Sequence, residues 1–184
     1  MNLLVAYESK YGFTKTYAQW LAGDLGATLL PAKEVTPGML QACDGFVYGG
    51  GLYAGGVSGI ALLTKNFEAL RHKPLYLFTV GAADVADDAN VAHIRASLAR
   101  TLTPDMLQTT HLYHLRGGMR YSQMSFLHRT MMNMMVKALR KKPENEQTAD
   151  DKAMLETWGQ DVDFTDRAAL APLVADIKAH MAAQ

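Results

Sequence analysis

The sequence has almost no cysteine. Cys43 is the only one among 184 residues, so neither a disulfide framework nor a zinc site built from several cysteines can form within one chain. A reducing compartment suits such a chain, and we expect a cytoplasmic protein. Long apolar runs are lacking too, because no stretch approaches the roughly 18 apolar residues that a membrane-spanning helix needs. The opening residues also have too short an apolar run for a signal peptide.

An excess of charge of one sign is likewise absent. The 18 Lys and Arg residues balance 18 Asp and Glu residues, which gives a formal net charge of zero. A dedicated nucleic-acid binder normally carries a basic excess, so that function is not expected. A carrier that finds its partners through a large acidic field is not expected either. The chain does have 49% hydrophobic residues, enough to bury the core of a single domain spanning residues 1–184.

Short β-branched and aromatic runs alternate with helical patterns along most of the chain. Strands are expected at residues 2–6, 28–31, 45–48, 75–80 and 109–115, and helices at 14–25, 57–70 and 88–100. This alternation predicts an α/β fold with a parallel sheet and right-handed crossovers. Five strands favour the order 2-1-3-4-5, in which ligands bind beyond the carboxyl ends of the strands. The loops after strands 1, 3 and 4 should therefore form the site.

The chain after the fifth strand is less regular. Residues 124–140 predict a methionine-rich helix with a broad apolar face, residues 144–151 a polar loop, and the last apolar stripe a helix with Pro172 in its first turn. The apolar face of the methionine-rich helix has two interpretations. In the first it packs on the sheet, where methionine fills irregular gaps. In the second it either rests on anionic lipid, aided by basic residues 137–142, or lines a quinone or porphyrin pocket.

The loop after the first strand combines a glycine, Gly12, with the hydroxyls of Ser9 and Thr14. A strand-to-helix junction presents unpaired N–H groups and the positive end of the helix dipole, both of which favour a phosphate. The alternative is an ordinary turn with Thr14 as the N-cap. Residues 49–54 fit a loose G-x-G-x-x-A pattern, but they follow the third strand and lack an acidic partner, so a dinucleotide site is weakly indicated.

These motifs together resemble the flavodoxin-domain family. Residues 9–14 (S-K-Y-G-F-T) resemble the FMN phosphate loop of flavodoxins, and residues 49–55 resemble their first flavin loop. Residues 117–121 (G-G-M-R-Y), the methionine-rich helix and residues 162–166 are similar to the branch that includes menaquinone-dependent protoporphyrinogen oxidases. The resemblance implies a flavodoxin-like three-layer sandwich with an extra methionine-rich helix after strand 5. It also implies non-covalently bound FMN.

The resemblance also implies which residues hold the cofactor. The phosphate would lie on the first loop and the ring between two later loops, which gives the set Ser9, Lys10, Tyr11, Gly12, Phe13, Thr14, Gly51, Leu52, Tyr53, Ala54, Thr79, Val80, Gly81 and Ala82. Tyr53 is expected to stack on the ring. The loop at 80–84 has no aromatic residue, so one flavin face is expected to be open to a substrate. No catalytic residue and no metal ligand is assigned.

The function implied is that of an FMN-dependent oxidoreductase whose small-molecule substrate is a porphyrinogen or a quinone. The alternatives are an electron carrier that serves a redox protein, and a cofactor-free module used for interaction. Peripheral contact at the inner face of a membrane follows from the second interpretation of the methionine-rich helix, and the oligomeric state stays open. Lys10, Arg116 and Arg120 lie in or beside the loops of the site, and we expect their charge to make the flavin less strongly reducing than in an acidic carrier.

Overall fold

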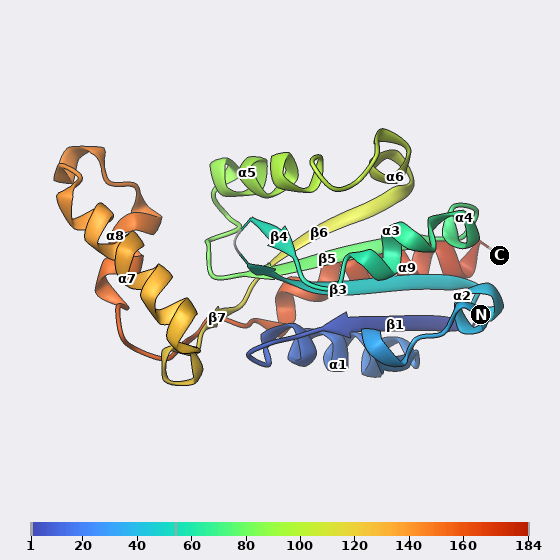
Figure 1. The fold of residues 1–184 in the computed structure, drawn as a ribbon. Helices are drawn as coiled ribbons and strands as arrows, with labels where there is room; N and C mark the ends of the chain where they lie inside the picture. The colour runs from blue at the N-terminus through green and yellow to red at the C-terminus, as the bar shows by residue number, and fades with distance from the viewer. Residues whose placement is uncertain (1, 54, 184) are drawn as a thin grey trace.

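The computed structural model describes residues 2–53 and 55–183, and a parallel sheet forms its centre (Figure 1). The strands lie in the order β2-β1-β3-β5-β6. They span Leu3–Glu8 (β1), Thr28–Pro31 (β2), Gly45–Tyr53 (β3), Leu75–Gly81 (β5) and Thr110–Arg116 (β6). The two-residue strand β4, Gly56–Val57, pairs antiparallel with the end of β3. The predicted order 2-1-3-4-5 is therefore confirmed, with β4 as an addition.

Helices cover both faces of the sheet, which makes the three-layer sandwich. One face packs against α1 (Phe13–Leu25) and α9 (Ala171–Ala182). The other packs against α2 (Pro37–Ala42), α3 (Ala61–Lys65), α4 (Phe67–Leu70) and α5 (Asp88–Leu98). The structure also has α6 (Pro104–Thr109) and the 3-10 turns Ala32–Glu34, Tyr121–Gln123, Glu144–Glu146 and Arg167–Leu170.

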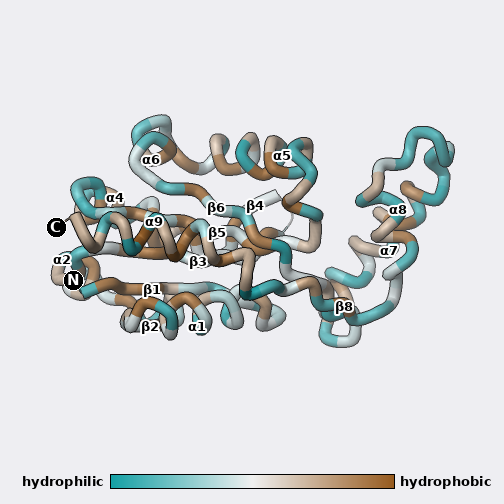
Figure 2. Tube along the Cα trace, turned by 180° about the vertical axis from the view of Figure 1, so that it is seen from behind, coloured by the Kyte–Doolittle hydropathy of each residue, from teal (hydrophilic) through white to brown (hydrophobic). Residues whose placement is uncertain are grey.

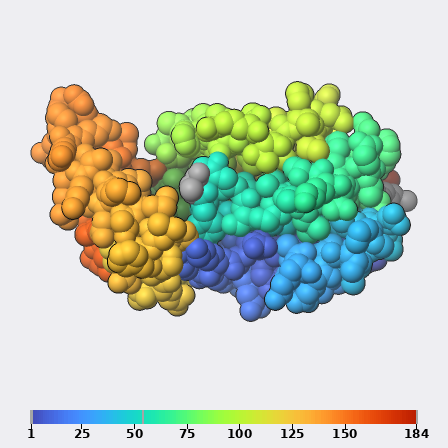
Figure 3. Space-filling view, viewed as in Figure 1, coloured from blue at the N-terminus to red at the C-terminus, as the bar shows by residue number. Residues whose placement is uncertain are grey.

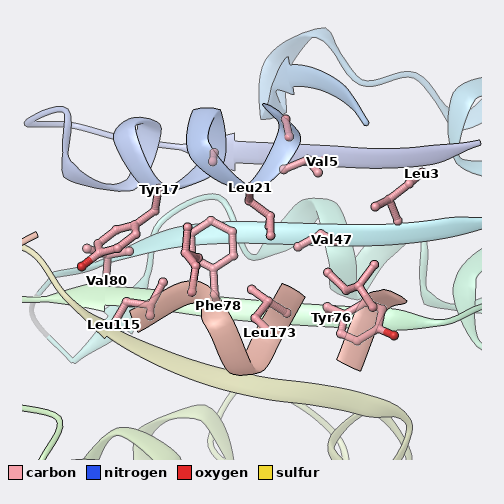
Figure 4. Packing of buried hydrophobic residues seen from close by; sticks show 14 of the residues in the cluster. Leu3, Val5, Tyr17, Leu21, Val47, Tyr76, Phe78, Val80, Leu115 and Leu173 are labelled. Carbon is pink, nitrogen blue, oxygen red and sulfur yellow. The ribbon is translucent and has the colours of Figure 1, made fainter. Parts of the chain in front are cut away.

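The first strand is a continuous apolar run because its side chains enter two hydrophobic cores, one on each face of the sheet. Leu3 and Val5 belong to the core under α1 and α9, whereas Leu4 and Ala6 belong to the core on the opposite face. All four are at most 3% exposed, as expected for a strand covered on both sides. Figure 4 shows the first core, with side chains of α1 and α9 packed against the central strands. Figure 2 shows the same concentration of hydrophobic residues (brown) along the sheet.

The prediction that the third strand ends at Tyr48 is wrong, because β3 runs on through the glycines to Tyr53. A Cβ on Gly49 would lie 2.1 Å from the ring of Phe78 on the neighbouring strand. The absence of a side chain at this position lets the fully buried ring cross β3. The glycines are thus part of the strand and bring the backbone of β3 up to the cavity described below.

The predicted helix at 57–70 is also wrong in extent. The N–H of Ser58 donates to the carbonyl of Gly51 at 2.9 Å, which continues the β3–β4 hairpin. Gly59 then adopts a φ of +67°, and a Cβ there would lie 2.1 Å from the hydroxyl of Tyr48. Only α3 and α4 are helical, and Asn66 separates them. The β3–β4 hairpin and the turn after it therefore occupy the residues that periodicity alone predicted to be the first turn of the helix.

A helical lobe, residues 126–156, lies beyond the carboxyl ends of the strands. It consists of α7 (Phe126–Lys141) and α8 (Ala149–Glu156), which lie side by side (Figure 1). The predicted loop at 144–151 contains the start of α8, which a capping box of Thr148 and Asp151 initiates. The interpretation of the methionine-rich helix as one that packs on the sheet is wrong, because it packs on α8. Among the described residues, no helix is both long and apolar enough to cross a membrane.

The chain returns from the helical lobe to the sandwich through a small pairing. Strand β7 (Gly118–Met119) pairs antiparallel with β8 (Val162–Asp163). Below it, the fully buried Tyr17 donates its hydroxyl hydrogen to the carbonyl of Arg116 at 2.7 Å and accepts from the N–H of Asp166 at 2.9 Å. One side chain of α1 therefore bonds both to the end of β6, which leads to the lobe, and to the segment after β8, which returns from it. Pro172 lies in the first turn of α9, as predicted.

Candidate functional site

The N-terminus of α1 lacks a side-chain cap. Gly12, with φ +95°, is the N-cap residue, and no side chain accepts a hydrogen bond from the first turn. The Ser9 hydroxyl instead accepts from the N–H of Gly12 at 3.1 Å. The alternative with Thr14 as an ordinary N-cap is wrong, because Thr14 lies inside the helix and is 2% exposed. The first-turn N–H groups and the helix dipole are left to bind an anion.

A cavity of about 510 Å³ lies beside this helix end, beyond the carboxyl ends of β1, β3 and β5. A volume of this size is typical of sites for small molecules and cofactors. From the three predicted loops the lining includes Tyr11, Phe13, Thr14, Leu52, Tyr53, Val80, Gly81 and Ala82. The structure thus brings together eight of the residues that the resemblance implied, from three segments far apart in the sequence.

The other implied residues that the structure describes do not line the cavity. Ser9, Lys10 and Gly12 form the loop at its edge, and Ala54 lies outside the described residues. Gly51 supports the site through its missing side chain, because a Cβ there would lie 2.7 Å from the ring of Tyr53. Thr79 is completely buried on the α5 side of the sheet, where its hydroxyl lies 2.8 Å from Nδ1 of His114.

Three aromatic rings meet at one side of the cavity. The centroids of Tyr11 and Tyr53 are 5.9 Å apart in an edge-on arrangement. The ring of His128, from α7, is parallel to Tyr53 within 14°, with centroids 6.4 Å apart. Burial raises the pKa of Tyr53 to about 12 and that of Tyr11 above its usual value, so both hydroxyls stay protonated near neutral pH. These rings provide a flat apolar surface with hydrogen-bond donors at its edge.

The helical lobe closes the cavity with methionines, a feature that the sequence suggested only in its second interpretation. From the lobe the lining includes Met131, Met132, Met134, Met135 and Met154, and the segment that leads to the lobe adds Met119 and Met124. The spacing of residues 124, 128, 131 and 135 is that of one helix face and is the signal that could have included His128 in the set. The sequence leaves two interpretations for His128, a substrate contact and a partly exposed histidine, and the structure has it half-buried in the lining of the cavity. Figure 3 shows the lobe (orange) meeting the loop after β1 (blue).

The cations around the site differ in how far their charge is neutralised. Arg116 pairs with Asp84 at 3.2 Å, and Arg120 pairs with Asp163 at 2.8 Å. Lys10 has no carboxylate within 4.0 Å among the described residues, and its Nζ lies 3.1 Å from Nδ1 of His128. Of the three cations in the electrostatic prediction, Lys10 is therefore the one whose charge is least neutralised by a carboxylate.

The histidines of β6 do not form a metal site. His111 lies 2.8 Å from Asp176 on α9, whereas His114 faces α5, so the two side chains lie on opposite faces of the sheet. Within the described ranges, no group of three or more His, Cys, Asp or Glu side chains could hold a metal ion. Burial lowers the pKa of His114 to about 4, with a smaller contribution from Arg95, which keeps this imidazole neutral.

Comparison with known proteins gives one family. A model described as "Flavodoxin domain" matches residues 4–146. No curated protein matches the chain. Among solved structures, a cysteine-to-serine mutant of flavodoxin from Pseudomonas aeruginosa aligns with a TM-score of 0.47 and 14% identity, over 73% of this chain and 93% of that one. Oxidised flavodoxin 1 from Bacillus cereus aligns with a TM-score of 0.41 and 14% identity, over 63% and 84% of the two chains.

Proposed function

Because the chain belongs to the flavodoxin domain family and has FMN as its cofactor, we propose that it is an oxidoreductase that acts on a small apolar substrate beside FMN. When bound, FMN supplies the exchange of one or two electrons. All residues, 1–184, would work as one FMN-binding domain with the helical lobe as its substrate side.

The residues present fit FMN. The uncapped first turn of α1 would hold the phosphate, and Ser9 already orients the Gly12 N–H next to it. Tyr53 would lie against the ring, and the ends of β3 and β5 would present backbone N–H groups to its polar edge. The cavity volume of about 510 Å³ leaves room for a flat group of this kind.

The single observation that carries an enzyme rather than a carrier is the continuity of the cavity. The same space that touches the three FMN loops extends to the methionines of α7. A thioether-lined wall beside the cofactor suits a large, flat, apolar substrate, because methionine adapts its shape and contacts aromatic rings well. The substrate classes we propose are a porphyrinogen as reductant and a quinone as oxidant. In each turnover the reductant loses two electrons and two protons, and the quinone takes up both to become a quinol.

The test is turnover by FMN-loaded protein. We expect about three quinones to be reduced for each porphyrinogen converted to a porphyrin, because this conversion removes six electrons and six protons and each quinone takes up two of each. Met132→Trp, which fills the cavity from α7, should slow this turnover at least tenfold while FMN remains bound. Met39→Trp is the matched control, because Met39 is an exposed residue of α2 that does not line the cavity. Absence of turnover, with rapid electron transfer to a redox protein, would instead support the carrier.

The carrier is the second candidate, and family membership itself favours it. In a carrier, the helical lobe would be the surface that meets a redox protein. The two functions differ in how the bound flavin is reduced in light. A carrier would pass through a stable one-electron state, whereas the enzyme would be reduced by two electrons directly.

We also propose that α7 binds peripherally to the inner face of a membrane that contains anionic lipid. Phe126 and Leu127 are 87% and 66% exposed. The helix has no acidic residue and carries Lys137, Arg140 and Lys141, a combination typical of interfacial helices. Co-sedimentation with vesicles that contain anionic lipid should be lost when these three cations are changed to Glu. No binding by the unaltered protein would exclude this contact.

A further inference from the structure

His128 is unlike the other residues that α7 contributes to the cavity. Its neighbours in the lining from this helix are all methionines. Its Nδ1 lies 2.9 Å from the Tyr11 hydroxyl and 3.1 Å from Nζ of Lys10. Two residues of the predicted phosphate loop therefore hold the imidazole in place. Because α7 otherwise packs on α8, this contact is what ties the helix to the cofactor loops.

The three rings form an open-sided box. Tyr53 and His128 are the parallel walls, with centroids 6.4 Å apart. The ring of Tyr11 stands at 66° to each of them, at 5.9 Å and 6.5 Å. A third aromatic ring between two parallel rings needs about 7 Å, twice a carbon contact of roughly 3.5 Å. The centroid distance of 6.4 Å is below this spacing, so α7 would have to move outward to admit a ring between the two walls.

The loop after β5 supplies no aromatic side chain to the cavity. Residues 80–83 are Val, Gly, Ala and Ala, so this loop offers no ring to the face of the flavin opposite Tyr53. His128 lines the cavity and presents a ring parallel to Tyr53 within 14°. We propose that His128 forms the second wall for the flavin ring, so that the helical lobe completes the cofactor site. His128 would then cover the face that was expected to be open, and a substrate would reach the flavin from the side of the α7 methionines. This inference rests on the placement of FMN in the cavity proposed above.

The experiment separates the ring of His128 from its hydrogen bond. His128→Phe keeps a flat ring but cannot bond to Tyr11, whereas His128→Gln keeps a hydrogen-bonding group but has no ring. Apoprotein is titrated with FMN and with riboflavin, and the flavin fluorescence is followed. We expect His128→Phe to bind both flavins within about twofold of the unaltered protein. His128→Gln and His128→Ala should weaken both by about 3- to 10-fold, the range of one aromatic contact.

Riboflavin is included because Tyr11 and Lys10 also belong to the phosphate loop. Loss of a wall weakens FMN and riboflavin by the same factor, whereas a disturbed phosphate loop weakens FMN alone. His93→Ala is the control, an exposed histidine of α5 that does not line the cavity, and it should change neither affinity. Matching unfolding midpoints would show that the variants are folded.

Three results would overturn the inference. One is unchanged affinity in His128→Ala, and another is full affinity in His128→Gln with a loss in His128→Phe, which would make the hydrogen bond the important contact. The third is a loss confined to FMN. If the unaltered protein bound neither flavin, the proposed function would fail as well, so the two failures are distinguishable.

Discussion

Replacement of Gly12 by Ala tests the phosphate cradle on which the cofactor site depends. Gly12 has φ +95° and ψ −26°, and a Cβ added there meets nothing within 4 Å. The cost of the change is therefore backbone strain and not a clash. Gly26, the C-cap of the same helix, also has a positive φ of 60° and free space around a Cβ. Gly26→Ala is thus a matched control at the other end of α1.

The two variants should differ in binding far more than in stability. A left-handed conformation costs a residue with a Cβ about 1–2 kcal/mol, which for a chain of this length lowers Tm by about 2–8 °C. In the Gly12→Ala variant, the backbone at position 12 can relieve this strain only by turning the first-turn N–H groups away from the phosphate. Hydrogen bonds to a charged group contribute about 1.5–3 kcal/mol, so FMN affinity should fall by about 10- to 100-fold.

The assay compares FMN with riboflavin, which lacks the phosphate. We expect Gly12→Ala to weaken FMN and leave riboflavin unchanged, and Gly26→Ala to change neither affinity. Calorimetry of both variants measures the strain independently. Equal affinity for FMN in Gly12→Ala and the unaltered protein, despite the expected fall in Tm, would refute the cradle.

Three further predictions concern stability and the flavin potential. Tyr17→Phe removes a buried hydroxyl with two hydrogen-bond partners, so urea titration should show a loss of about 2–4 kcal/mol in the free energy of unfolding. Tyr121→Phe, whose hydroxyl has a single contact of 3.4 Å among the described residues, should lose little. The pKa of His114 falls from 6.5 to about 4 on folding, so below pH 6.5 the unfolded state binds a proton that the folded state excludes. The free energy of unfolding should therefore decline from pH 6.5 to 4, by about 1–2 kcal/mol after allowance for partial exposure, and His114→Gln should flatten this slope. Lys10→Gln should lower the midpoint potential of bound FMN by roughly 20 mV in a redox titration, and an unchanged potential would contradict the assigned role of that charge.

The strand order and most of the cofactor loops could be predicted from local patterns. Apolar runs such as residues 2–6 are long enough to mark strands covered on both faces, and Gly26 marks the end of α1. Once the order of a parallel sheet is known, the carboxyl ends of its strands must share one edge. Periodicity failed at 57–70, because the hairpin after β3 depends on glycines whose neighbours come from β1 and β3.

The wall of the cavity opposite the loops could not be predicted in this way. The pattern of residues 124–140 shows an apolar face but does not show which element packs against it. Packing against the sheet was a reasonable expectation. Only the tertiary structure places α7 on α8, through the pairing of β7 with β8 and the buried hydroxyl of Tyr17.

The sequence alone determined the strands and the phosphate loop, since both follow from patterns among residues near one another in the chain. The tertiary structure alone decided that His128 meets Tyr11 and Tyr53, because these residues are 117 and 75 positions away from it. Their meeting depends on how the whole chain closes over the ends of the strands.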